Sequence, residues 1–150
     1  MKKAIGHTAG LRTGPFIWLA ALLLWTNSCE FAEDLAGTDA GKLEGVWQCE
    51  EESELLKSTS GIFYYEVTIL QDEDVSNRII IFNFYQLGPY VSAEATVSGL
   101  RINMNTELEG GFTANGTGTL SSNYKRIDWT YSVNDGSDVL DHVSATYTRP

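Results

Sequence analysis

Residues 127–133 read IDWTYSV, residues 134–136 read NDG, and residues 143–147 read VSATY. In the first and third of these stretches every second side chain is apolar, a period of two that puts the apolar side chains of a strand on one face. An Asn-Asp-Gly sequence between two such stretches is typical of a hairpin turn. This part of the chain therefore predicts two antiparallel strands with one buried face.

The same alternation extends back to residue 46 and predicts six more strands. The first four, with the residues expected on their buried faces, are 46–50 (Trp47, Cys49), 62–70 (Phe63, Tyr65, Val67, Ile69), 78–84 (Ile80, Phe82, Phe84) and 90–97 (Val91, Ala93, Ala95, Val97). After the tight-turn signal at Ser98-Gly99, Leu100, Ile102 and Met104 alternate in the fifth. The sixth, 112–120, carries Gly116 and Gly118 where side chains would stand, which indicates a bend or a close backbone approach.

Eight short strands with mostly short connections favour an all-β fold, an eight-stranded antiparallel up-and-down meander barrel. Closing such a meander removes the exposed strand edges that promote aggregation. A barrel of eight strands is either filled by its own side chains or holds one small ligand. An open or split sandwich is the alternative architecture.

The start of the chain has the order of an export signal. Lys2, Lys3 and Arg12 precede an apolar run from residue 15 to 25. At about 1.5 Å per residue, the run covers only roughly half of a ~30 Å hydrocarbon core as a helix, so a membrane-spanning segment is not expected. Next comes Ser28-Cys29, a small residue before a cysteine. We therefore expect residues 1–28 to be a signal peptide, residues 29–42 a lipidated cysteine and flexible acidic tether, and residues 43–150 the barrel domain.

The residues around Cys29 resemble the lipobox of bacterial lipoproteins, although Thr26 and Asn27 depart from its usual pattern. The resemblance implies diacylglycerol on the Cys29 thiol and membrane association through that lipid. Glu30, Glu33 and Asp34 follow at once, as in the surface-export signals of Bacteroidetes lipoproteins. The expected location is the bacterial outer membrane, facing outward. Ordinary secretion with cleavage near Ser28 is the alternative.

Charge excludes one class of partner. All twenty Asp and Glu follow Cys29, against seven of the ten Lys and Arg, so the chain after the signal has a formal charge of −13. Phosphate binding needs a basic face, and we therefore expect no nucleic-acid partner. If Cys29 carries lipid, Cys49 is the only other cysteine, which leaves no internal disulfide and no Cys-based zinc site.

Two features at opposite ends of the predicted domain resemble lipocalin-like barrels. Gly45-Val46-Trp47 matches their Gly-x-Trp on the first strand, and Arg149 stands where they carry an arginine that packs across that tryptophan. We expect Gly45 to let the chain pass close under the barrel floor, and Trp47 and Arg149 to close the barrel. Over nearly its full mature length the chain is similar to small lipocalin-like lipoproteins of Bacteroidetes, with GVWQCEEES, IFNFYQLG and WTYSVNDG. That similarity implies a fold and a location but no reaction.

Few residues suggest chemistry. His142 is the only histidine after the signal and shares the outer face of its strand, so it offers neither a metal site nor a triad. The carboxylate runs Glu50, Glu51, Glu52, Glu54 and Asp72, Glu73, Asp74 are interpreted as solvated acidic loops, since neither has the spacing of a calcium loop. Cys49 is expected to be a small buried hydrophobe. The sequence thus predicts no enzyme, no metal and no cofactor.

Aromatic residues are the remaining candidates for ligand contact. Tyr64, Phe84, Tyr85, Tyr90 and Tyr124 could rim a barrel mouth and stack on a sugar or another flat molecule. The favoured function is a non-catalytic, lipid-anchored envelope barrel that binds a small apolar or sugar-like ligand or a protein partner. The alternative is a structural or accessory subunit of an outer-membrane complex with a filled barrel.

Overall fold

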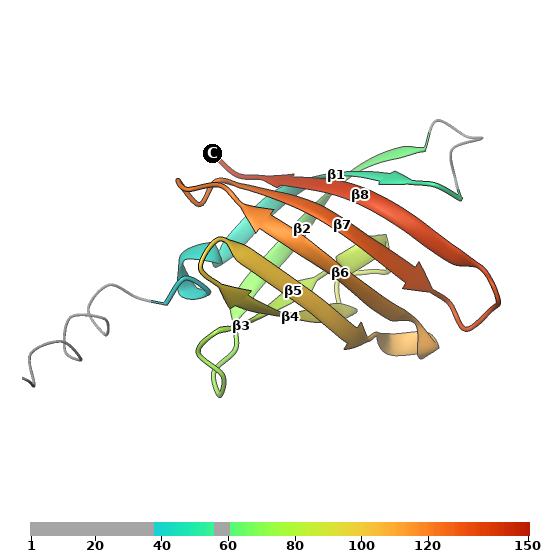
Figure 1. The fold of residues 1–150 in the computed structure, drawn as a ribbon, viewed down its shortest axis with the longest axis horizontal. Coiled ribbons are helices and arrows are strands. Elements are labelled where there is room, and N and C mark those ends of the chain that lie inside the picture. Colours follow the sequence, from blue (N-terminus) through green and yellow to red (C-terminus); the bar gives the residue numbers. More distant parts are fainter. Residues whose placement is uncertain (1–37, 56–60) are drawn as a thin grey trace, which may run out of the picture. The chain divides into compact units, whose positions relative to one another are not determined.

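The computed structural model describes residues 38–55 and 61–150, which form one closed barrel. The predicted signal, Cys29 and residues 29–37 of the predicted tether lie outside these residues. Each strand pairs antiparallel with the next, and β8 returns to pair with β1 (Figure 1). The strands are β1 (Gly45–Ser53), β2 (Ile62–Gln71), β3 (Arg78–Phe82), β4 (Ser92–Ser98), β5 (Arg101–Glu107), β6 (Thr113–Leu120), β7 (Arg126–Asn134) and β8 (Leu140–Thr148). The predicted eight-stranded meander barrel is confirmed, and the open sandwich is excluded.

The predicted hairpin strands, β7 and β8, pair along their full length. Trp129 lies opposite Ala145 and Tyr131 opposite Val143, and all four side chains are buried inside the barrel. Closure depends on β1 and β8, which pair from Gln48 opposite Thr148 to Ser53 opposite Val143. No helix among the described residues is long and apolar enough to cross a membrane.

Strand β3 corrects one predicted face. The buried residues are Ile79 and Ile81, not Ile80 and Phe82. Phe84 is buried as predicted, although it shares no strand face with Ile80. The reason is Asn83, whose left-handed backbone (φ 59°) follows the strand end and breaks the period of two, so that Phe84, the next residue, points to the interior.

Strand β6 shows why glycine stands at two positions. A Cβ on Gly116 would lie 2.3 Å from the Cβ of Tyr131 on β7, and a Cβ on Gly118 would lie 3.0 Å from the Trp129 ring. These large side chains occupy the space that β6 leaves free. The expected close backbone approach is present, and it allows aromatic residues to fill the barrel.

The barrel has two distinct ends, and successive connections between strands lie at opposite ends. One end, which we call the base, holds residues 38–44, the connections 72–77, 99–100 and 121–125, and residues 149–150. The mouth is the opposite end, formed by Leu55, the connections 83–91, 108–112 and 135–139, and the strand ends beside them. In Figure 1 the base lies on the left and the mouth on the right.

The domain begins earlier than predicted. Residues 38–42, expected as the end of a flexible tether, pack against the base: Ala40 is buried, and Asp39 accepts a hydrogen bond of 2.7 Å from the hydroxyl of Tyr124. The 3-10 helix η2 (Gly41–Leu43) then buries Leu43. The small residues of this stretch fit tightly against the barrel, a contact that composition alone does not indicate.

Candidate functional site

The base is closed by the pair that the sequence singled out. The guanidinium carbon of Arg149 lies 4.6 Å from the centroid of the Trp47 ring, which is fully buried. Arg149 also donates to the backbone carbonyls of Tyr124, Glu44 and Lys42, and the Trp47 Nε1 donates to the carbonyl of Leu43 at 2.8 Å. One side chain thus ties together four segments of the chain at this end.

Gly45 serves the base in a different way from the one expected. Its φ is +129°, and a Cβ built there would meet nothing within 4 Å. The glycine is therefore explained by backbone conformation and not by a close approach under the floor, because side chains rarely tolerate this φ.

At the mouth a loop segment enters the barrel. We call residues 83–91 the plug, which includes the 3-10 helix η4 (Phe84–Gln86). Phe84 is fully buried, with its ring centroid 4.9 Å from that of Tyr131. Phe84 thus closes the core from this side.

The backbone of the plug is strained. Asn83, Tyr85 and Gln86 all have φ between 53° and 59°, a left-handed conformation that costs free energy in residues other than glycine. Asn83 stabilises this conformation by donating from Nδ2 to the Glu66 carbonyl at 2.8 Å and accepting from the Gly88 backbone at 3.2 Å. Strain of this kind persists only where surrounding contacts hold it, and it concentrates at functional sites.

Asp141 provides the strongest of those contacts. Its side chain is 2% exposed, and its Oδ2 accepts hydrogen bonds of 2.6 Å from both the Ser53 and Tyr85 hydroxyls. Its Oδ1 accepts from the backbone N–H of Leu55 at 3.1 Å. Burial opposes ionisation of Asp141, but these hydrogen bonds outweigh burial and lower the pKa of the carboxyl below its ordinary value. The ionised carboxylate therefore joins β8, β1 and the plug.

Glu51 is a second buried carboxyl, and it corrects the interpretation of residues 50–54 as a solvated loop. These residues continue β1 up to Ser53, and Glu51 is 3% exposed inside the barrel. Its Oε2 accepts hydrogen bonds from the hydroxyls of Tyr65 and Tyr131. Burial raises the pKa of Glu51, and the nearby Asp141 adds to the rise, although the two tyrosine hydroxyls oppose it.

Three further residues meet their predicted surroundings. Cys49 is buried, and burial raises the pKa of its thiol to about 12, which disfavours the reactive thiolate. His142 is exposed, with Nδ1 2.9 Å from the Ser132 hydroxyl. Asp72 accepts from the backbone N–H groups of Asp74 and Val75, as expected of an acidic turn.

The five aromatic residues predicted to rim one mouth do not lie together. Phe84 fills the core and Tyr85 is engaged with Asp141, whereas Tyr90 projects from the plug and is 88% exposed. Tyr64, 71% exposed, faces outward from β2. Tyr124 is at the base, with Lys42 Nζ 4.8 Å from its ring. The prediction missed this separation because it did not assign the connections to alternate ends.

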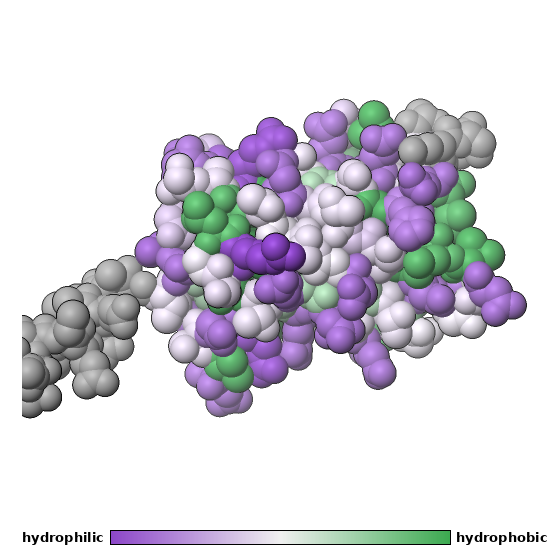
Figure 2. Space-filling view, viewed as in Figure 1, coloured by the Kyte–Doolittle hydropathy of each residue, from purple (hydrophilic) through white to green (hydrophobic). Residues whose placement is uncertain are grey.

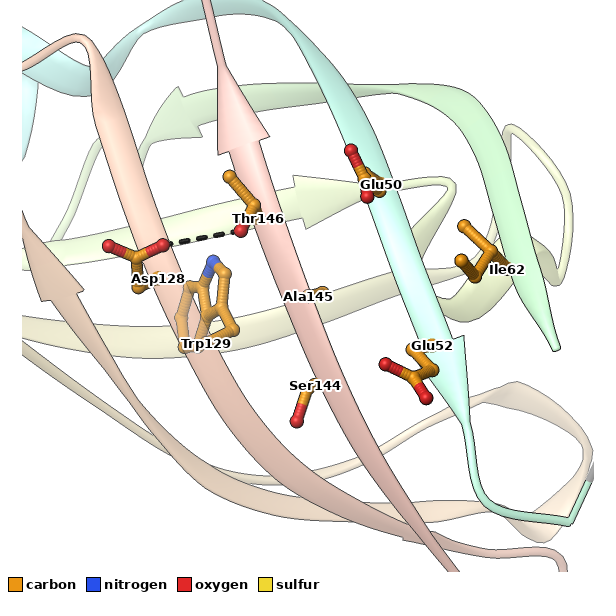
Figure 3. A pocket seen from close by; sticks show the side chains of 8 residues that line it. All are labelled: Glu50, Glu52, Ile62, Asp128, Trp129, Ser144, Ala145 and Thr146. Carbon is orange, nitrogen blue, oxygen red and sulfur yellow. Dashed lines mark hydrogen bonds between the residues drawn. The ribbon is translucent and has the colours of Figure 1, made fainter. Parts of the chain in front are cut away.

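The outer wall of the barrel carries a shallow acidic groove (Figure 3). Its cavity volume is about 280 Å³, and it runs across β1, β8 and β7 past Glu50, Glu52, Ser144 and Asp128. Asp128 is already bound by Arg126 at 2.6 Å and by the Thr146 hydroxyl at 3.2 Å. Among the described residues no three His, Cys, Asp or Glu are placed to hold a metal ion.

The hollow at the mouth is smaller. Its cavity volume is about 90 Å³, and Leu55, Tyr85, Phe112, Val139 and Asp141 are among the residues that line it. Sites for small molecules typically measure about 300–1,000 Å³. This hollow can therefore take one side chain but not a ligand of ordinary size.

Comparison with known protein families and with curated proteins found no match to this chain.

Proposed function

We propose that this protein is a lipid-anchored envelope protein whose filled, lipocalin-like barrel acts as an accessory subunit through its surface. Of the two functions that the sequence leaves open, the geometry favours the protein-interaction role over ligand binding. The observation that carries the proposal is the content of the barrel. Its largest fully buried side chains include Trp47, Tyr131, Tyr147 and Phe84, which occupy the space where a ligand would sit.

The two buried carboxyls support the same conclusion. Glu51 and Asp141 bind tyrosine and serine hydroxyls of the barrel itself, so their hydrogen-bonding capacity holds the structure together. A site for a polar ligand would keep such groups available to the ligand. We therefore assign them a positioning role and propose no catalysis.

The proposed anchor fits the way the chain enters the barrel. Thr38 is at the base, so a tether from Cys29 would join the domain at the end opposite the mouth. Lipid with two or three acyl chains holds a protein stably on a membrane. The mouth is thus the end available to a partner.

The anchor is tested by Cys29→Ser. We expect the variant to leave the membrane fraction, while Cys49→Ser, the matched control, stays with it. A Cys29→Ser protein that still fractionates with membranes would contradict the anchor.

The accessory role is tested by native mass spectrometry of the full-length protein, extracted in detergent from its own envelope. We expect a complex of fixed stoichiometry with a second protein. A monomer that retains a stoichiometric small molecule would contradict a filled barrel.

A further inference from the structure

The two ends of the barrel differ in the balance of their charge, because the described Lys and Arg gather at one of them. Every Lys and Arg that the structure describes either lies in the base or is the first residue of a strand that begins there: Lys42, Arg78, Arg101, Lys125, Arg126 and Arg149. Lys57, in the segment 56–60, is outside the described residues. Carboxylates occur at both ends, and the exposed ones at the mouth include Glu107, Glu109, Asp135 and Asp138. The described part of the mouth is therefore strongly negative.

At the base, cations lie among the acidic residues and pair with several of them. Lys42 pairs with Asp39 at 2.9 Å, Arg78 with Asp72 at 3.0 Å and Arg126 with Asp128 at 2.6 Å. Each ion pair formed within the described ranges takes its cation from this end. The uncompensated charge of the described barrel is thus concentrated at the mouth.

Apolar side chains accompany that charge. Leu55, Tyr90, Val139 and Leu140 are exposed at the mouth, and Figure 2 shows apolar surface gathered at this end, on the right of the view. The base also exposes apolar side chains, such as Val75 and Leu100. In the described part of the mouth they accompany carboxylates that have no Lys or Arg at the same end, and a hollow that fits one side chain.

We propose that the mouth is the docking site for a basic, amphipathic segment of a partner protein. Its Lys or Arg side chains meet Glu109, Asp135 and Asp138, and one apolar side chain enters the hollow between Leu55, Phe112 and Val139. The charge decides the occupant, because complementary potential selects a cationic partner and disfavours an acidic one. The aliphatic stems of Lys and Arg also cover apolar surface while their charged ends stay in water.

This inference rests on the accessory role proposed above and names its surface and its partner. It is tested with a short synthetic peptide of alternating lysine and leucine, labelled for fluorescence anisotropy. The protein is the full chain carrying Cys29→Ser, so that no lipid competes for the peptide. Peptides alternating glutamate with leucine, and lysine with serine, separate the contributions of charge and apolar contact.

The decisive comparison uses matched charge variants. Glu109→Gln with Asp138→Asn removes two exposed carboxylates at the mouth, and Glu73→Gln with Asp74→Asn removes the same two types at the base. We expect the mouth pair to weaken binding of the lysine–leucine peptide about fivefold and the base pair to leave it unchanged. Val139→Ser should weaken it as well, whereas Leu100→Ser should not.

Three results would overturn the docking site. The glutamate–leucine peptide binds as well as the lysine–leucine peptide, or the base pair weakens binding as much as the mouth pair does. Alternatively, 1,5-diaminopentane displaces the peptide completely, which would assign the mouth to a small organic cation.

The native complex separates this inference from the proposed function. A complex that persists unchanged in the mouth-pair variant places the partner elsewhere and overturns the docking site alone. If the wild-type protein forms no complex in its own envelope, the accessory role fails too.

Discussion

At the base, Arg149 lies over Trp47 and donates to three backbone carbonyls, and Arg78 pairs with Asp72 in the acidic turn. At the mouth, the core is closed by Phe84 on a left-handed backbone segment, held by the carboxylate of Asp141. The base has one left-handed residue other than glycine, Tyr124, and carries cations beside its carboxylates, whereas the plug at the mouth has three such residues and the described part of the mouth carries carboxylates without Lys or Arg. From this difference we propose that the base serves stability and the mouth serves recognition, because strained backbone and unbalanced charge concentrate at functional sites.

Trp47→Ala should produce the largest effect and test the base. Removing the buried indole should lower the free energy of unfolding by about 3–5 kcal/mol in chemical denaturation. Val46→Ala, on the outer face of the same strand, is the control and should change it little. In the double variant with Arg149→Ala, the loss of unfolding free energy should differ from the sum of the two single losses by about 0.5–2 kcal/mol, the range of a cation–π contact. Strictly additive losses would show that Trp47 and Arg149 do not interact, and would contradict this pair as the closure of the base.

Asp141→Asn should give the next largest effect, at the mouth. The amide cannot accept from Ser53, Tyr85 and Leu55 together, so we expect a loss of about 2 kcal/mol at neutral pH. Because the pKa of Asp141 is lowered from 3.8, its ionised form stabilises the fold above that pH and ceases to do so as pH falls through the lowered pKa. The difference in free energy of unfolding between wild type and Asp141→Asn should therefore become smaller below about pH 3.8. A difference independent of pH would show that the charge of Asp141 does not hold the plug; Asp138→Asn is the exposed control.

Tyr85→Phe should affect the plug and leave the base unchanged. Loss of the hydrogen bond to Asp141 should cost about 1.5 kcal/mol. Hydrogen exchange should accelerate in residues 83–91, with the amides at the base unchanged. Equal acceleration at both ends would mean that the plug opens only when the whole barrel unfolds.

Glu51→Gln should have the smallest effect, and its sign depends on pH. The pKa of Glu51 is raised from 4.5, so the folded protein keeps a proton that the unfolded chain releases above that pH. Wild-type stability should then fall as pH rises from about 4.5 through the raised pKa, a decrease that glutamine lacks. In thermal unfolding, the midpoint temperature of Glu51→Gln should rise relative to that of wild type as the pH increases across this range. The opposite slope would mean that Glu51 is ionised in the fold.

The strand pattern made the barrel predictable, but only where alternation continued. Trp129, Tyr131, Val143 and Tyr147 were assignable because each stands two residues from the next inward position. The same period would have identified Glu51, which follows Trp47 and Cys49, had its charge not suggested a solvated loop. Asp141 likewise shares the parity of Val143 on β8. For both residues the hydrophobic pattern was the better guide, because buried hydroxyl groups satisfy the carboxyl.

The mouth was less predictable for a different reason. Asn83 breaks the period of two through a left-handed backbone, which no alternation rule detects, and so the faces of residues 78–84 were partly wrong. Tyr124 and Tyr90 reach opposite ends because successive turns of a meander alternate. Assigning each turn to one end of the barrel therefore requires knowing the order of the strands first. Predictions about Cys29 and the tether up to residue 37 remain predictions.

We propose that the mouth, and not the base, meets a partner. A photoreactive amino acid placed at Tyr90 on the mouth, and separately at Leu100 on the base, tests it in living cells after irradiation. We predict a single protein adduct from position 90, with its cross-linked peptide rich in lysine or arginine beside apolar residues, and none from position 100. An adduct from position 100 alone, or a cross-linked peptide at position 90 that is acidic, would contradict the claim.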